Sequence, residues 1–400
     1  MKRVRIVLLA VCMIFAVSAS AEVTIQFWTQ EGTADGGFQF VEKLTNAYME
    51  QNPGVNIELV SKDTEVLRED FQTSSLAGDA PDLLWTVSDQ AGPFTKADLL
   101  QPVDDLFDLS IYVDSAVDGV QLDGQVWGVP VANGNHLMLL FNKELIAEAP
   151  ANTDEMIAKG KELTGGEQYA LVWNQVEPFW MVPWLGGFGG SVFADDGVTP
   201  TLNTSEMIAT LTFLHDMKFS AKIIPSESDY GGADTLFKEG KAAMIINGDW
   251  SLGDYKSALG DKLGTAPIPM VSATEQWPAP YTSGKFLMIS ATVGDDTLEA
   301  IMQFVDYLTN LENQVDMIAT LSRLPALKEA LDSELIQNDP ILKGSAAQMQ
   351  NGTPMPVVME MRCNWDSMKP EMNAVLADQK SPEDAVMAMQ QAADACIQGL

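Results

Sequence analysis

The chain has 400 residues, of which 46% are hydrophobic and 20% are charged, a composition that excludes a disordered or fibrous protein. Asp and Glu outnumber Lys and Arg by 56 to 23, and the net charge is -33. Because such a field repels phosphate backbones and anionic lipid surfaces, nucleic-acid binding is excluded as a main role.

The N-terminus has the features of a secretory signal peptide. A basic start precedes an apolar stretch over residues 6–17 and the small-x-small sequence Ala19-Ser20-Ala21. We predict a signal peptide over residues 1–21, cleaved before Glu22, and a mature net charge of -36 because three basic residues are lost. The apolar stretch is shorter than the ~20 residues that span a bilayer. We therefore expect a soluble protein in the periplasm or another extracytoplasmic compartment.

The three cysteines bear on anchoring and on cross-linking. Cys12 ends the sequence Leu9-Ala10-Val11-Cys12, but Val11 is bulky where a lipobox needs a small residue, and the apolar run continues. Lipid anchoring at Cys12 is therefore not expected. Cys363 and Cys396 can pair after export to an oxidising compartment, or they can be two buried free thiols on helices. The sequence leaves both possibilities open.

The predicted elements alternate between strands and helices. Residues 23–28 are expected as a buried strand, 38–51 as an amphipathic helix and 55–60 as a second strand, which together form a βαβ unit. The later elements are helix 67–77, strand 82–87, short helix 91–97, a turn at 123–125, extended residues 126–131, strand 137–142 and a last helix over 383–398. This order predicts an α/β protein with mainly parallel sheets flanked by helices.

Several helix starts carry recognisable caps. Asn152, Asn203 and Asp296 each precede a Glu by three residues, which is the capping-box spacing. Ser381 is followed by Pro382 at the expected first helical position. The length suggests two domains, and because no Pro- or Ser-rich linker separates them, ordered crossing segments must connect them.

Catalytic and cofactor motifs are mostly missing. The chain has only two histidines, His136 and His215, which leaves little material for a metal centre or a His-based triad. No cofactor and no metal is expected. The run from Gly186 to Gly190 lacks the spacing of a phosphate-binding loop, and we expect a flexible loop beside a pocket, with a plain turn as the alternative.

Aromatic residues at loop positions are the more informative feature. Their flat apolar faces, beside amide and carboxylate groups, suit a sugar with its C–H faces and rim of hydroxyls. For Trp173 and Trp184 core packing is the stronger expectation. Trp250 follows Asn247-Gly248-Asp249, and the Asn-Gly turn should place it at a strand end as a ligand contact. The other aromatic residues at these loop positions are Trp173, Phe179, Trp180 and Trp184, which are interleaved with Asn174, Gln175 and Glu177.

The same region carries a family resemblance. Its clearest segment is Phe237-Lys238-Glu239-Gly240-Lys241-Ala242-Ala243-Met244, continued by Ile245-Ile246-Asn247-Gly248-Asp249-Trp250. Segments 77–82, 123–130, 140–145 and 354–385 match in the same order. The chain thus resembles the family 1 extracellular solute-binding proteins, the maltose-binding-protein-like sugar receptors of ABC importers.

The resemblance implies a two-lobed periplasmic-binding-protein fold of type II, with a ligand cleft between lobes that close by hinge bending. By matching order, one lobe is expected at residues 22–132 and 269–325. The other is expected at residues 136–267 and 329–400. Hinge segments then lie near 133–135, 267–269 and 326–329.

The resemblance also implies a set of ligand-binding residues, although several family positions have changed. Asp89 and Glu177 are expected to accept sugar hydroxyls, and Phe179 and Trp250 to stack on the sugar. Phe179 replaces a tyrosine, Thr86 a stacking tryptophan, Asn135 an acid and Gln90 a basic residue, which puts maltose itself in doubt. The full predicted set is Gln30, Glu31, Asp89, Asn135, Glu177, Phe179, Trp250 and Arg362.

The small number of arginines restricts the class of ligand that the protein can bind. Beyond the signal peptide only Arg68, Arg323 and Arg362 occur, too few for a phosphate clamp, so sugar phosphates are disfavoured. Arg362 could bind one carboxylate or cap a helix. We predict a monomeric, non-enzymatic receptor that delivers a sugar to the permease subunits of an ABC transporter. The alternatives are an exported carbohydrate-active enzyme using Glu177 and Asp89, and a receptor for polyamines or other cations.

Overall fold

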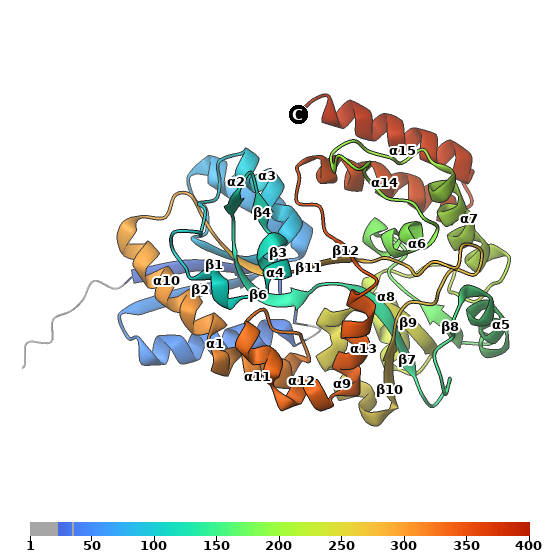
Figure 1. Ribbon diagram of the computed structural model, residues 1–400, viewed down its shortest axis with the longest axis horizontal. Coiled ribbons are helices and arrows are strands. Elements are labelled where there is room, and N and C mark those ends of the chain that lie inside the picture. Colours follow the sequence, from blue (N-terminus) through green and yellow to red (C-terminus); the bar gives the residue numbers. More distant parts are fainter. Residues whose placement is uncertain (1–22, 34–35) are drawn as a thin grey trace, which may run out of the picture.

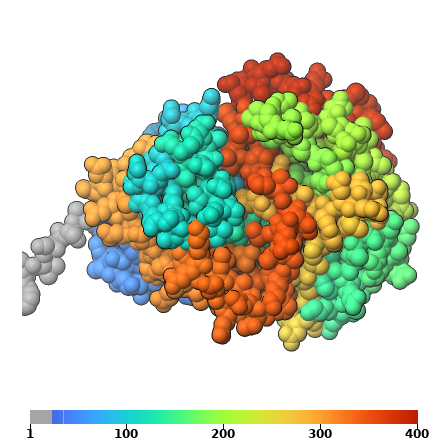
Figure 2. All heavy atoms as spheres, viewed as in Figure 1, coloured from blue at the N-terminus to red at the C-terminus, as the bar shows by residue number. Residues whose placement is uncertain are grey.

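The computed structural model describes residues 23–33 and 36–400, which form two α/β halves side by side (Figure 1). The predicted signal peptide, its cleavage site and Cys12 lie outside these residues. In the space-filling view the blue-to-cyan and the green residues form separate bodies, and the orange-to-red segment runs along the junction between them (Figure 2).

The first half is built on a sheet with the strand order β12-β11-β3-β1-β2, with β6 paired to β11. Strand β1 runs parallel to β2 and β3, whereas β11 runs antiparallel to β3 and β6. All five side chains of β3 are buried, which explains its continuous apolar sequence LLWTV. The strands are β1 (Val23–Thr29), β2 (Val55–Ser61), β3 (Leu83–Val87), β6 (Val129–Gly134), β11 (Tyr281–Ile289) and β12 (Thr353–Pro354).

Helices cover this sheet on both faces (Figure 1). In α10 the apolar stripe recurs with helical period and is buried, and Phe304 packs edge-on against Phe27 of β1 with ring centroids 5.7 Å apart. The helices of this half are α1 (Gly37–Gln51), α2 (Thr64–Ala77), α3 (Ala91–Lys96), α4 (Asp114–Asp118), α10 (Asp295–Thr309) and α11 (Leu311–Leu321).

The second half contains the sheet β10-β7-β9-β8. Its strands are β7 (Leu137–Asn142), β8 (Tyr169–Val172), β9 (Ala242–Gly248) and β10 (Leu263–Ala266). The prediction of mainly parallel sheets is wrong here, because β7 runs antiparallel to both β9 and β10, and only β8 and β9 are parallel. The reason is topological: β7 follows directly from β6 of the other sheet and not from a βαβ crossover, so no right-handed crossover fixes its direction.

The helices around the second sheet come from distant parts of the sequence. In Figure 1 the C-terminal helices α14 and α15 lie beside α7 and close over the same side of the molecule. They are α5 (Thr153–Leu163), α6 (Val182–Gly187), α7 (Ser205–Phe219), α8 (Tyr230–Lys238), α9 (Leu252–Leu259), α13 (Pro340–Met349), α14 (Glu360–Leu376) and α15 (Pro382–Ile397). The short elements β4 (Gln121–Leu122), β5 (Gln125–Val126) and α12 (Glu334–Asn338) complete the fold.

The predicted caps are only partly correct. Asn152 accepts the Glu155 amide at the start of α5, and Ser381 caps α15 with Pro382 as its first residue. The cap predicted at Asn203 lies one residue later, where Thr204 accepts the Met207 amide. Asp296 is inside the first turn of α10, because that helix already begins at Asp295.

Two other expectations are resolved by packing. Cys363 of α14 and Cys396 of α15 form a disulfide, so they are not free thiols. The glycine run is not a loop beside a pocket: Gly186 and Gly187 end α6, and a Cβ on Gly186 would lie 2.6 Å from the Cβ of Ala279. Glycine is needed there because two backbones approach closely.

No helix in the described ranges is long and apolar enough to cross a membrane. The same part of the chain contains no group of three or more His, Cys, Asp or Glu side chains that could hold a metal ion.

Candidate functional site

The candidate site lies where strand ends of the two sheets face the junction. Because β1 and β3 are parallel, Gln30 and Asp89, which follow them, are brought to the same edge of the first sheet. In the second sheet the parallel pair β8 and β9 does the same for Phe179 and Trp250. Ligand sites at the carboxyl ends of strands are a general property of open α/β sheets.

Five aromatic side chains meet at this edge and are called here the aromatic cluster: Phe179, Trp180, Tyr230, Trp250 and Trp365. Phe179 lies centrally, with ring centroids 5.6 Å from Trp180, 6.2 Å from Trp250 and 6.3 Å from Trp365. Trp180 is 7% exposed, whereas Phe179, Trp250 and Trp365 are each partly exposed. Tyr230 is partly exposed as well, so the cluster combines one buried ring, Trp180, with four partly exposed rings.

The Trp250 side chain is held by close contacts with Tyr230 and Gly248. Its Nε1 donates to the hydroxyl of Tyr230 at 3.0 Å. Its ring lies so close to Gly248 that a Cβ there would be 2.1 Å from Trp250 Cζ3. The prediction that Trp250 lies at a strand end is confirmed, but the Asn-Gly turn is wrong. Gly248 has an extended φ of -89° and is the last residue of β9, which leads directly into a 3-10 helix over Asp249–Ser251.

Asp89 lies opposite α14. Trp365 Nε1 donates to its Oδ2 at 3.4 Å, which brings a residue of the first half into contact with a helix of the second. Burial and the nearby negative charge of Glu65 raise the pKa of Asp89 to about 6. Hydrogen-bond donors such as sugar hydroxyls would stabilise the charged form of this carboxyl group.

Two of the predicted residues are engaged in ion pairs. Glu177 Oε1 lies 2.5 Å from Lys369 Nζ of α14. Arg362 Nη1 lies 2.5 Å from Glu65 Oε2 of α2, and Nη2 lies 2.6 Å from Asp366 Oδ1. Arg362 therefore does not cap a helix; it joins α14 to α2 across the junction.

Gln30 and Asn135 have polar partners beside the site. Gln30 Oε1 accepts the Thr86 hydroxyl at 3.0 Å. Asn135, in the connection between β6 and β7, has a φ of 46°, and its side-chain amide donates to Ser283 Oγ at 3.2 Å. Its backbone amide donates to Asp249 Oδ2 at 3.1 Å, next to Trp250.

Glu31 is the predicted residue that lies deepest. It is 2% exposed, and its Oε2 is 2.8 Å from Nη1 of the equally buried Arg323. Lys285 Nζ lies 3.7 Å from Oε1. Although burial raises the pKa of Glu31, Arg323 and Lys285 outweigh this effect and hold the pKa below its usual range.

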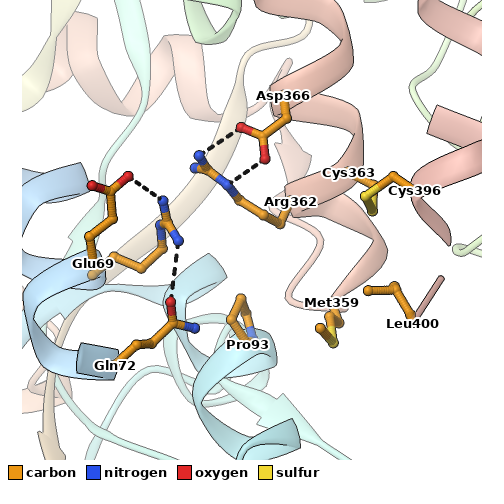
Figure 3. A pocket seen from close by; sticks show the side chains of 10 residues that line it. Glu69, Gln72, Pro93, Met359, Arg362, Cys363, Asp366, Cys396 and Leu400 are labelled. Atoms are coloured by element: carbon orange, nitrogen blue, oxygen red, sulfur yellow. Dashed lines mark hydrogen bonds and ion pairs between the residues drawn. A yellow bond between two sulfur atoms is a disulfide. The ribbon is translucent and has the colours of Figure 1, made fainter. Parts of the chain in front are cut away.

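A pocket of about 400 Å³ opens beside Arg362 (Figure 3). Arg68, Glu69 and Gln72 of α2 line one wall, and α14, the disulfide and Leu400 line the other. In Figure 3 the Arg362 and Asp366 side chains point toward one another at its edge. The pocket thus lies between the same two helices that the Glu65–Arg362 ion pair joins.

Trp365, Arg323 and Lys285 were not among the predicted site residues. Trp365 lies three residues after Arg362, so helical spacing places both on neighbouring positions of α14 and could have indicated it. No local pattern marks Arg323 or Lys285, because their partner Glu31 belongs to a distant segment. Trp173 and Trp184 are 2% and 0% exposed, which confirms the expected core packing.

The fold is that of a two-lobed binding protein. Residues 43–344 match the family model described as bacterial extracellular solute-binding protein. The chain belongs to this family, and the resemblance found in the sequence is thereby confirmed.

Three similar proteins illustrate the relationship. The maltose/maltodextrin-binding domain from Bdellovibrio bacteriovorus, solved with maltotriose, is 36% identical, with a TM-score of 0.90 over 94% of this chain and 100% of that one. The Thermus thermophilus maltotriose-binding protein, also solved with maltotriose, is 25% identical, with a TM-score of 0.86 over 93% and 100%. The maltotriose-binding protein of Pyrococcus abyssi is 27% identical over 86% of this chain and 75% of its own length. The two-lobed fold of type II is thus confirmed.

Proposed function

We propose that this protein is an exported receptor that captures a maltooligosaccharide between its two halves and delivers it to the permease subunits of an ABC transporter. The observation that carries the proposal is the aromatic cluster facing Asp89 across the junction. The relatives named above, two of them solved with maltotriose, support the class of ligand.

The chemistry of the cluster suits a sugar. The partly exposed rings of Phe179, Trp250 and Trp365 offer flat apolar faces for pyranose C–H groups. Asp89 and Glu177 offer acceptors for hydroxyls, and Gln30 and Asn135 offer amides that can both donate and accept. Arg362 closes the edge nearest the pocket of Figure 3. We propose each of these residues as a ligand contact.

Closure of the two halves provides the signal to the transporter. A ligand that touches both halves only when they are shut stabilises the closed form, and a shift from 1:99 to 99:1 needs roughly 5.5 kcal/mol of differential affinity. Bending is assigned to the predicted hinge segments near 133–135, 267–269 and 326–329, and the predicted lobes are 22–132 plus 269–325 and 136–267 plus 329–400. Two short segments depart from these boundaries: residues 270–279 hydrogen-bond to the second half, and Thr353–Pro354 pairs with β11 of the first sheet.

The two alternative functions fit the site less well. A polyamine needs ionised carboxylates without cationic partners, but Glu31 is paired with Arg323, and Glu177 with Lys369. The general acid of a glycosidase is kept protonated by apolar burial, whereas the Glu177 side chain is 36% exposed and in an ion pair. A binding role without catalysis is therefore favoured. Export, a mature N-terminus at Glu22 and a monomeric state belong to the same proposal.

Isothermal titration calorimetry with maltotriose tests the proposal. Wild type should bind it and return it chemically unchanged after prolonged incubation. Trp250→Ala should weaken binding by more than tenfold without unfolding, because a stacking face is lost. Trp277→Ala is the matched control, since Trp277 is 43% exposed and outside the aromatic cluster. Binding of spermidine but of no sugar, or cleavage of maltotriose, would refute the proposal.

A further inference from the structure

Three charged side chains are buried beneath the aromatic cluster, and we call them the basal ion cluster: Glu31, Lys285 and Arg323. Glu31 and Arg323 are each 2% exposed and Lys285 is 8% exposed. Burying charges is costly even when they are paired, and replacing such groups by apolar ones is often neutral for stability. A role in placing neighbouring groups would explain why the charges are retained.

Arg323 connects the cluster to the candidate site. One guanidinium nitrogen, Nη1, lies 2.8 Å from Glu31 Oε2 in the loop after β1. Another, Nη2, donates to the backbone carbonyl of Trp250 at 3.3 Å. The planar fork of an arginine fixes the relative positions of two such acceptors, which a lysine cannot do as a point charge. Arg323 therefore ties the exit of β1 to the exit of β9.

Besides Arg323, contacts from Asn135 and Lys285 also hold the segment around Trp250. Asp249 Oδ2 accepts the Asn135 amide of the β6–β7 connection at 3.1 Å. Lys285 Nζ lies 5.9 Å from the centroid of the Trp250 ring, within range of a cation–π contact. The Trp250 indole is thus oriented by Tyr230 and Gly248 of its own half and by Lys285 of β11. Its backbone is held by Arg323 and, through Asp249, by the β6–β7 connection.

We propose that Arg323 is a positioning residue for ligand binding: it holds the Trp250 backbone in the position in which the indole can stack on a sugar. Glu31 orients Arg323 and does not itself contact the ligand. This inference rests on the proposed function in so far as the ligand is a sugar. The placement of Trp250 itself does not depend on the ligand.

The first experiment examines that placement without ligand. The protein is labelled with 5-fluorotryptophan, and the Trp250 fluorine signal is assigned with Trp250→Phe. In Arg323→Gln the Trp250 signal should shift or broaden, while the signals of the buried Trp173 and Trp184 stay in place. Should Arg323→Gln not fold, Arg323→Lys takes its place, because it keeps a positive charge beside Glu31 but loses the planar fork that also reaches the Trp250 carbonyl. A Trp250 signal identical to that of wild type would overturn the inference.

The second experiment is a double-mutant cycle with maltotriose, measured by calorimetry. Arg323→Gln should weaken binding by about tenfold in the wild-type background and by less than twofold in the Trp250→Ala background, because its effect passes through Trp250. Arg323→Lys should recover little of the loss. Lys218→Gln is the control, a partly buried cation that donates to the Leu376 carbonyl far from the aromatic cluster.

The outcomes separate the two ideas. Equal losses in both backgrounds would mean that Arg323 acts on the fold as a whole, and the positioning role would be wrong. Absence of maltotriose binding by wild type would count against the proposed function alone, since the fluorine spectra still decide whether Arg323 places Trp250.

Discussion

Single residues at the site differ most in their electrostatic surroundings. Glu31 and Glu177 are neutralised by cations, whereas Asp89 faces Trp365, Tyr281 and the carboxylate of Glu65, with Arg362 as the nearby positive charge. Burial is the main reason that the pKa of Asp89 rises to about 6. Its protonation state therefore changes within the pH range in which proteins are ordinarily handled.

Sugar affinity should consequently depend on pH through Asp89. Hydroxyl donors bind the ionised carboxylate better, so binding releases a proton and affinity rises with pH through the pKa. For a pKa near 6, the ionised fraction, and with it the affinity, grows by up to about tenfold between about pH 5 and pH 7. Calorimetry across this range measures it. Asp89→Asn should bind more weakly at pH 7 but with a flat profile, while the exposed Asp79→Asn keeps the wild-type profile. A flat wild-type curve would contradict the assignment.

Protonation of Asp89 also affects stability, with a defined sign. Its folded pKa lies above the unfolded value of 3.8, so the folded state binds more protons between about pH 4 and pH 6. Stability therefore falls as pH rises through this window. The same Asp89→Asn protein should lose that part of the decrease, which thermal unfolding without ligand will show.

At the scale of elements, α14 contributes most to the site and depends on α15. The two helices pack along their length, with Met368 and Met372 of α14 and Val386 and Met389 of α15 buried. Near its N-terminal end α14 carries Arg362, Cys363 and Trp365, so the disulfide to Cys396 holds the turn that faces the first half. The C-terminal helix thereby stabilises a part of the candidate site that it does not itself form.

Removal of the disulfide should lower the free energy of unfolding. The closed loop has a sequence separation of 33 residues, and for loops of this order the stabilisation is about 2–4 kcal/mol. Cys363→Ala with Cys396→Ala should show this loss in urea denaturation, and wild type with reductant should approach the variant. An unchanged midpoint would mean that packing of α15 alone suffices.

Local elements could be predicted from the sequence because their signals are local. The βαβ unit over residues 23–60, the turn at Asp123-Gly124, where φ is 55° and 81°, and the cap at Ser381 all follow from neighbouring residues. The antiparallel course of β7 could not be predicted, since it depends on the strand that it meets. Trp250 could be proposed because it follows Asn247-Gly248-Asp249, and Asp89 because it matches a position of the family that the sequence resembles. The pairing of Glu31 with Arg323 could not be predicted, because the two residues lie far apart in the sequence.

At the scale of the whole molecule, contacts across the junction set how readily the halves separate. α2 and α14 are joined by Glu65 and Arg362 at 2.5 Å, and Asp89 and Trp365 meet beside them. The Glu65 and Arg362 side chains are 50% and 27% exposed, so water screens their attraction. We therefore expect the ion pair to act as a weak latch in the proposed closure, which it biases without locking it.

Glu65→Gln should shift the unliganded protein toward the open form. Partly exposed pairs contribute roughly 0.2–1 kcal/mol, so maltotriose affinity should fall by no more than about fivefold at about pH 8, where Asp89 is ionised with or without the Glu65 charge. Small-angle X-ray scattering should give a larger radius of gyration for the unliganded variant. Because the Debye length is only about 3 Å at 1 M salt, the difference from wild type should vanish there.

The matched control for this latch is a similar ion pair that stays within one half. Lys43 of α1 and Asp316 of α11 lie 2.6 Å apart, and both helices belong to the first half. Asp316→Asn removes an exposed attraction of the same kind, but it leaves the junction intact, so radius and affinity should not change. If the two variants behave alike, the Glu65–Arg362 pair has no special part in closure. If only Glu65→Gln opens the molecule, the balance between open and closed forms depends on charges at the rim of the cleft as well as on the ligand.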